Sequence, residues 1–491
     1  AIIDEKGNDV DYTIIKSRDL TDYVLSQTIM LDPSRKFYVP DQVLEVTMAI
    51  KANDVPALGY VQYSIDTQKD SHKETADKKV LENKYYTIEV EENGSLTIVD
   101  KANNVTYKNQ GILVENGDDG DSFNYSPPRK DMEVFSNESK CTVKISGSDI
   151  YDQAEIHFDM VVPADLDERA EGKVSVTMLV DMTVALRKDS KVIDFNVKVD
   201  NKGLSHRLCV LFDSQIVSAF NYADQQFGLI KRPNYYEKEM KLYMESMNNK
   251  TEKKAGIQEL ANWANDQSTW QEPPISIEPT QSYVSLTDGK TGIAVIPQGV
   301  REYEVLDDSK IRLTLFRTYG FMGKENLIYR PGRASGERII ETPAAQLLKE
   351  MEFNFGFTSY AGDINDSDID TLAKQYNTNL EVYTYAEFLN GRLIFSQREI
   401  EGQNAKIHSL FETEGNLVVS AVKKAEEDDG YIIRLYNGKD HKDLDDKIKF
   451  NFDIKEAYYT NLKEEKTEEI KVENNTISVK ELSHCKFVTI W

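Results

Sequence analysis

Apolar and polar residues alternate along most of the chain. Residues 87–91 and 95–99 alternate on either side of a turn at Asn93-Gly94. A period of two places neighbouring side chains on opposite faces of a strand, and Asn-Gly favours the positive φ angles of a tight hairpin turn. The same alternation recurs in residues 173–178, 192–199, 311–316 and 432–436. Many short strands of this kind predict antiparallel sheets packed as sandwiches.

Helical patterns are few. Ser367 and Asp370 have the spacing of a capping box, and Leu372 and Tyr376 follow one turn apart. Residues 253–265 give a weaker helical pattern. We therefore expect a mainly β protein built of tandem antiparallel β-sandwiches. More than about a third of its residues should lie in strands and under about 15% in helices.

Two stretches indicate boundaries between domains. Residues 68–79 are charged and contain no large apolar side chain, so we expect a linker or an exposed loop there. A second boundary is expected within residues 362–391. The predicted domains are a small β-sandwich at 1–70, a large β-sandwich at 78–375 and a C-terminal β-sandwich at 385–491.

The charge of the chain excludes some classes of partner. Its 491 residues include 59 Lys and Arg against 84 Asp and Glu, which gives a net charge of −25. A field of this sign repels phosphate backbones and anionic lipid, so binding to nucleic acid or to a membrane surface is disfavoured. No apolar run in the sequence is long enough to span a membrane.

The cysteines are few and widely spaced. Cys141, Cys209 and Cys485 are odd in number and fit no metal-binding spacing. No secretory signal peptide opens the chain, which begins with Ala1 in a pattern typical of a strand. We interpret the cysteines as reduced thiols of a cytoplasmic protein, and we expect the chain to be a piece of a longer one.

Familiar catalytic motifs are absent from the sequence. The histidines never form His-Glu-x-x-His, and no Gly-x-Ser-x-Gly elbow occurs. Residues 289–291 are similar to the end of a phosphate loop, but Val284 stands where that motif needs Gly, so a hairpin turn is expected. His157 and Asp159 share one face of an expected strand. Apolar residues alternate with them, which indicates a solvated pair and not a metal site.

One acidic loop is a candidate for ligand binding. Residues 116–121 are dense in carboxylates, but their spacing does not match a calcium loop. They form either an acidic tight turn or a loop that presents Asp121 to a ligand. Phe123 and Tyr125 follow at once. An aromatic ring beside a carboxylate suits a sugar, because the ring packs on the C–H face while hydroxyls donate to the acid.

Several segments, in order along the chain, together resemble the bacterial branch of glycoside hydrolase family 38, the α-mannosidases and mannosylglycerate hydrolases. They are residues 55–60 (Val-Pro-Ala-Leu-Gly-Tyr), 120–128 (Gly-Asp-Ser-Phe-Asn-Tyr-Ser-Pro-Pro), 292–305, which ends in Glu-Tyr-Glu-Val, 330–333 (Arg-Pro-Gly-Arg) with 342–346, and 420–426 with 434–437. The resemblance spans essentially the whole chain.

This resemblance implies the architecture of a longer enzyme. The centre of the chain should be a galactose-mutarotase-like supersandwich. The α/β catalytic domain, which in the family carries the zinc and an Asp nucleophile, should lie outside the chain as its N-terminal partner. The chain would then start inside the small sandwich, hold no catalytic or metal-binding residue, and be inactive alone.

The resemblance also implies a function. The parent enzyme should hydrolyse α-mannosides with retention and use zinc, and the chain should complete its active site and take part in a homo-oligomer. Asp121, Phe123 and Tyr125 are the expected substrate-binding residues, because the family's loop at this position reaches the catalytic pocket. Relatives often carry Tyr where Phe123 stands, so the hydroxyl that can bond the sugar is missing here.

Two other functions stay open. One is a stand-alone carbohydrate-binding or scaffold protein with the same sandwiches. The other is a different enzyme on a mutarotase-like sandwich, which would need a His and Glu pair to act as acid and base on a sugar ring. A catalytic domain encoded upstream of Ala1 would favour the family 38 enzyme, and a start codon there would favour the stand-alone protein.

Overall fold

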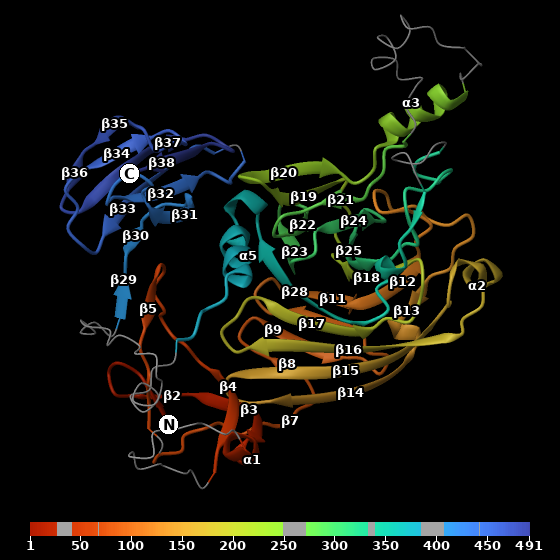
Figure 1. Ribbon diagram of the computed structural model, residues 1–491, viewed down its shortest axis with the longest axis horizontal. Helices are drawn as coiled ribbons and strands as arrows, with labels where there is room; N and C mark the ends of the chain where they lie inside the picture. Colours follow the sequence, from red (N-terminus) through yellow and green to blue (C-terminus); the bar gives the residue numbers. More distant parts are fainter. Residues whose placement is uncertain (27–41, 67, 249–271, 332–338, 384–406, 441) are drawn as a thin grey trace, which may run out of the picture.

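The computed structural model describes residues 1–26, 42–66, 68–248, 272–331, 339–383, 407–440 and 442–491 (Figure 1). Strands account for 49% of the structure and helices for 9%, which confirms the expected mainly β fold. The helical pattern at 253–265 falls outside the described residues. Within the described residues, no helix is both long and apolar enough to cross a bilayer.

A large assembly of antiparallel sheets, here called the supersandwich, forms the centre of the molecule. Its widest sheet has ten strands, in the order β20 (Gly228–Pro233), β19 (Phe220–Gln225), β22 (Val284–Thr287), β23 (Thr291–Gln298), β28 (Glu350–Ala361), β17 (Ile193–Asp200), β16 (Val176–Arg187), β15 (Tyr151–Val162), β14 (Lys140–Gly147) and β7 (Ala76–Asp77).

Two further sheets complete the supersandwich. The six-stranded sheet has the order β13 (Val134–Phe135), β12 (Ile112–Gly117), β18 (His206–Asp213), β25 (Lys310–Arg317), β24 (Glu302–Leu306) and β21 (Glu278–Pro279). The four-stranded sheet has the order β11 (Val105–Gln110), β10 (Leu96–Asp100), β9 (Tyr86–Val90) and β8 (Leu81–Glu82).

The alternating pattern explains how these sheets bury one face. Along β15, Ile156 and Phe158 are buried while His157 between them is partly exposed. Aromatic rings then join the sheets. Phe195 of the ten-stranded sheet lies 5.2 Å from Phe355 of the same sheet and 5.4 Å from Phe212 of the six-stranded sheet. Buried rings of this size contribute the most apolar area per residue, so this cluster is the centre of the core.

The N-terminal region consists of small sheets and one short helix. Its elements are β1 (Ile2–Ile3), β2 (Asp9–Val10), β3 (Tyr12–Asp19), α1 (Thr21–Ser26), β4 (Leu44–Ile50), β5 (Gly59–Val61) and β6 (Ser64–Ile65). Residues 68–79 leave this region along a mostly exposed path, and within them β7 pairs with β14 as the edge strand of the ten-stranded sheet. The predicted linker therefore also contributes to the large sheet.

The C-terminal region is a sandwich of two antiparallel sheets around its own apolar core. One sheet has the order β30 (Phe411–Thr413), β33 (Leu444–Phe450), β37 (Thr476–Leu482) and β36 (Val472–Glu473). The other has the order β31 (Val418–Lys424), β32 (Tyr431–Tyr436), β38 (Phe487–Ile490), β34 (Ala457–Thr460) and β35 (Lys466–Ile470). A further strand, β29 (Ile407–Ser409), pairs with β5 of the N-terminal region.

This terminal sandwich packs against the supersandwich beside β20 and helix α5 (Ile369–Asn377) (Figure 1). Phe227 stacks on Phe487 at 5.4 Å and meets Tyr436 edge-on at 5.5 Å. The Leu229 N–H donates to the Gly438 carbonyl at 3.1 Å. The helix predicted after Ser367 is α5. Besides α1, the other described α-helices are α2 (Leu166–Glu171) and α3 (Glu237–Asn248).

The predicted hairpin turn at Asn93-Gly94 gives the first test. Gly94 has a φ of +80°, and a Cβ there would meet the buried Phe158 ring at 2.5 Å. Gly289, in the turn before β23, has a φ of +81° with nothing within 4 Å of a Cβ. We expect Gly94→Ala to lower the free energy of unfolding by about 1–3 kcal/mol more than Gly289→Ala, because only the first forces the core to shift. Urea unfolding measures both variants, and an equal loss of unfolding free energy in the two would contradict this packing.

Candidate functional site

The acidic loop predicted from the sequence connects β12 to β13. It begins beside the middle strands of the six-stranded sheet, where β12 pairs with β18 and β18 pairs with β25. A second loop, residues 318–331, follows β25 and packs against the first through hydrogen bonds to Asp121 and Ser126. The two loops therefore fold as one unit on a sheet that sets their position.

Asp121 lies inside this unit. Its carboxylate is fully buried and accepts hydrogen bonds from the backbone N–H groups of Phe123 at 2.9 Å, Asn124 at 3.0 Å and Lys324 at 2.8 Å. It also forms an ion pair with the buried Arg330 guanidinium. Burial alone would raise the pKa of Asp121, but Arg330 and the backbone donors outweigh it and hold that pKa below its ordinary value. The carboxylate therefore fixes the loop from within.

Phe123 is the exposed tip of the loop. The turn closes through the Asp121 N–H, which donates to the Asn124 carbonyl at 3.0 Å, and this geometry leaves 60% of Phe123 exposed. Ordinary loop tips carry polar residues, so a large exposed ring held on a fixed turn is a candidate contact surface.

Tyr125 is the buried base of the loop. Its hydroxyl accepts a hydrogen bond from Asn116 at 3.0 Å, and the Arg207 guanidinium lies 3.9 Å from its ring centroid. Tyr329 of the second loop meets the ring edge-on at 6.0 Å. Only 7% of Tyr125 is exposed, so it anchors the loop to the sheet.

Arg317, at the end of β25, clamps the same turn. Its guanidinium pairs with the buried Asp118 carboxylate at 2.6 Å. It also donates to the carbonyls of Asp121 and Asn124, both at 2.9 Å. Gly120 lets the chain approach this closely, because a Cβ there would lie 2.1 Å from the Asn124 carbonyl oxygen.

A layer of buried charge continues beneath the loops. The Glu115 carboxylate of β12 pairs with Arg169 of α2 and lies 2.9 Å from Nδ1 of His206. Arg169 also donates to the Met132 carbonyl at 2.6 Å, where the first loop returns to the sheet. Buried charges are tolerated when they are paired and hydrogen-bonded, and this set ties both ends of the loop to β12.

The sequence did not single out the arginines that organise this site. Arg330 stood inside one of the segments that resemble the family, but nothing in its neighbourhood indicated Asp121 as its partner. Arg317 ends a strand whose alternation was recognised, yet a single basic residue at a strand end is common. Their partners lie about 200 residues earlier, so no local spacing links them.

His157 and Asp159 form part of a polar cluster on β15 and its neighbours. Nδ1 of His157 lies 2.6 Å from the Asp181 carboxylate and Nε2 lies 3.2 Å from that of Asp159, which also pairs with Lys140 at 3.0 Å. The hydrogen bond with Asp181 is the main cause that raises the pKa of His157. Over the described ranges, no three His, Cys, Asp and Glu side chains form a group that fits a metal ion.

Breaking the Arg330 ion pair gives a test of the loop's anchoring. Arg330→Met should lower the free energy of unfolding by about 3–5 kcal/mol, because the Asp121 carboxylate would stay buried without its counter-charge. Hydrogen exchange at residues 121–124 should accelerate. Arg18→Met is the control, because the Arg18–Glu45 pair is exposed and such pairs contribute about 1 kcal/mol or less. A similar loss of unfolding free energy in the two variants would contradict the assignment of Arg330 and Asp121 as a buried ion pair that holds the loop.

The lowered pKa of Asp121 gives a pH test. A carboxyl whose pKa is lower in the folded state stabilises the fold above its ordinary value of 3.8 and loses that contribution as the pH falls through the folded value. The stability difference between the wild type and Asp121→Asn should be constant near neutral pH and shrink on acidification below 3.8. Urea unfolding across this range measures it, and a difference that grows in acid would contradict the assignment.

Comparison with known proteins identifies the family. The Glycosyl hydrolases family 38 C-terminal domain matches residues 81–321, and the family 38 C-terminal beta sandwich domain matches residues 416–489. A putative mannosylglycerate hydrolase from Halalkalibacterium halodurans is 24% identical over 420 residues, which cover 82% of this chain and 40% of that protein.

Two solved structures share the fold over the whole chain. An alpha-mannosidase from Enterococcus faecalis V583 superposes with a TM-score of 0.73 at 19% identity and covers 100% of this chain and 50% of its own. A glycosyl hydrolase family 38 protein from Enterococcus faecalis superposes with a TM-score of 0.71 at 19% identity, and the match covers 100% of this chain and 52% of that protein's chain. The chain thus spans about half the length of the relatives it matches. Since family 38 domains match most of its residues, the chain belongs to glycoside hydrolase family 38.

Proposed function

We propose that this chain is the C-terminal part of an α-mannoside hydrolase and that its two packed loops complete the sugar-binding pocket of that enzyme. The observation that carries the proposal is the exposed Phe123 ring on a turn fixed by buried ion pairs. The names of the relatives, a mannosylglycerate hydrolase and an alpha-mannosidase, support a mannoside as the substrate.

Phe123, Asp121 and Tyr125 have different roles in this proposal. Phe123 contacts the sugar, because an exposed aromatic face packs on the C–H face of a pyranose. Asp121 is a positioning residue, since its carboxylate is buried and holds the turn that carries Phe123. Tyr125 fixes the base of the loop through Asn116 and Arg207. Binding through a pre-formed loop loses little conformational entropy when the sugar arrives.

The bond-breaking chemistry belongs to the rest of the parent enzyme. Retaining hydrolysis needs a nucleophilic carboxylate and an acid/base carboxyl about 5 Å apart. Asp118 and Asp121, the buried loop carboxylates, are both committed to arginines and are unsuited to either role. We assign the nucleophile, the acid/base and the family's zinc to an N-terminal catalytic domain, which is the main partner of this chain. A cytoplasmic location and a homo-oligomeric enzyme are further parts of the proposal.

The test uses the full-length parent enzyme and an activated α-mannoside. Phe123→Ala should lower kcat/KM about tenfold, equivalent to about 1.4 kcal/mol of lost transition-state binding, with the melting temperature unchanged. Tyr431→Ala is the control, because Tyr431 is equally exposed at 60% but lies on β32 of the terminal sandwich. The isolated chain should show no turnover. Unchanged kinetics in a folded Phe123→Ala enzyme would remove the loop from the substrate site.

A further inference from the structure

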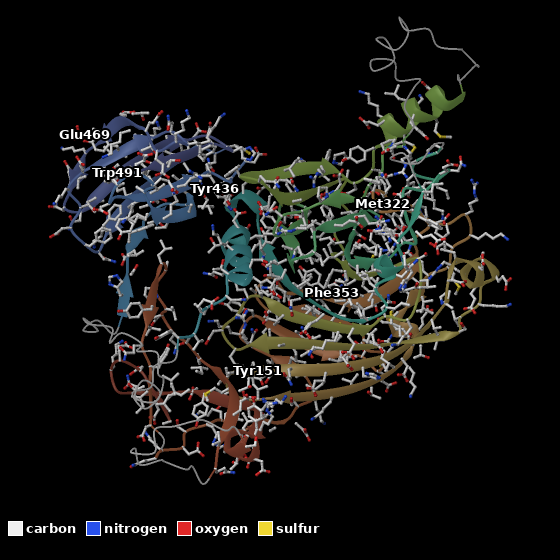
Figure 2. All side chains as sticks on the ribbon, viewed as in Figure 1. Tyr151, Met322, Phe353, Tyr436, Glu469 and Trp491 are labelled. Atoms are coloured by element: carbon white, nitrogen blue, oxygen red, sulfur yellow. The ribbon has the colours of Figure 1, made fainter. Side chains whose placement is uncertain are left out.

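A second site lies where the supersandwich, α5 and the terminal sandwich meet. A pocket of about 250 Å³ opens between them, a volume that corresponds to about eight water molecules. Figure 2 shows Tyr436 on the side of the terminal sandwich that faces α5. The residues that matter most for its chemistry are Asp224, Ser282, Tyr283, Asp370, Lys374 and Tyr436. None of them belongs to the loops that carry Phe123.

Contacts across the junction fix the walls of this pocket. Asp370 of α5 accepts a hydrogen bond from the Tyr283 hydroxyl at 2.6 Å and pairs with Lys439 of the terminal sandwich at 2.5 Å. Lys374, one turn further along α5, donates to the Val419 carbonyl of the terminal sandwich at 2.5 Å. The pocket is therefore pre-formed by both bodies, and ligand sites often occur at such junctions between domains.

Asp224 is a half-buried carboxylate in the wall of the pocket. One carboxylate oxygen, Oδ2, accepts a hydrogen bond from the Ser282 hydroxyl at 2.5 Å. The other, Oδ1, has no hydrogen-bond donor among the residues that the structure describes. Burial raises the pKa of Asp224 to about 6, the Ser282 hydrogen bond opposes this shift, and the nearby Asp370 carboxylate adds to it. A ligand that donates a hydrogen bond to the second oxygen would therefore stabilise this carboxylate.

The lining selects a class of ligand. The carboxylates of Asp224 and Asp370 repel an anion, and covering them with an apolar molecule would remove them from water without replacing their hydrogen bonds. Lys374 and Lys439 already offset the two negative charges, so a bound cation would gain little electrostatic free energy. A hydroxylated molecule can donate to Asp224, accept from Lys374 and pack its C–H groups on Tyr436.

We propose that this pocket binds a compact, neutral polyhydroxylated molecule, a monosaccharide or a polyol, and that the bound molecule links the terminal sandwich to the supersandwich. The site goes beyond the proposed function, because it shares no residue with the loop that carries Phe123. A ligand that binds only the folded junction also stabilises it in proportion to its occupancy.

Saturation-transfer NMR on this chain tests the proposal, with D-mannose and glycerol as neutral probes and putrescine as a cationic one. We expect contact signals from D-mannose or glycerol with weak, ~millimolar affinity. Asp224→Asn keeps the shape of the side chain and should weaken binding about tenfold or more, because a hydrogen bond to a charged acceptor is lost. Asp149→Asn is the matched control at an exposed carboxylate outside the pocket, and its binding should equal that of the wild type.

Two further variants separate the possible outcomes. Lys374→Gln changes an exposed residue of the same pocket, so it reports on the site even if Asp224→Asn fails to fold. Phe123→Ala should leave this binding unchanged, which separates the pocket from the loop of the proposed enzyme. Binding of putrescine in preference to both neutral probes, no binding of either neutral probe, or binding that survives both pocket substitutions would overturn the proposal.

Discussion

The buried pairing of Arg330 with Asp121 is the interaction on which the candidate site depends. Removing both charges from water is costly, and backbone N–H groups that donate to the carboxylate offset part of this cost, while a second arginine, Arg317, donates to the backbone carbonyls of the same turn. These contacts hold the turn that leaves the Phe123 ring exposed.

The sheets supply the rigidity that this pairing needs. Arg317 ends β25, and Arg207 on the adjacent β18 lies over the Tyr125 ring, so strands at the centre of the six-stranded sheet hold both loops. The opposite face of that sheet packs through Phe212 onto the ten-stranded sheet. A shift of the loop would thus have to disturb either the core or the buried charges, and a site built on such elements is more precise than one on free loops.

Much of the fold could be predicted from the sequence, because strand patterns and turn residues act locally. The alternation around His157 and the turn at Gly94 both have the predicted form. The candidate site could be predicted less well. Asp121 was expected to face a ligand, whereas its carboxylate faces Arg330. Acidic residues that follow one another in a loop show no periodicity, so the sequence does not indicate which of them is buried. The pocket at Asp224 was missed for a related reason, because its lining comes from segments far apart in the chain.

A crystal structure of the full-length parent enzyme with a bound mannoside or transition-state analogue would test the central claim most directly. The account predicts that the Phe123 ring packs on the sugar while Asp121 stays paired with Arg330 beneath it. A sugar bound in the catalytic pocket with Phe123 distant from it, or with the Asp121 carboxylate turned out to bind its hydroxyls directly, would contradict the account.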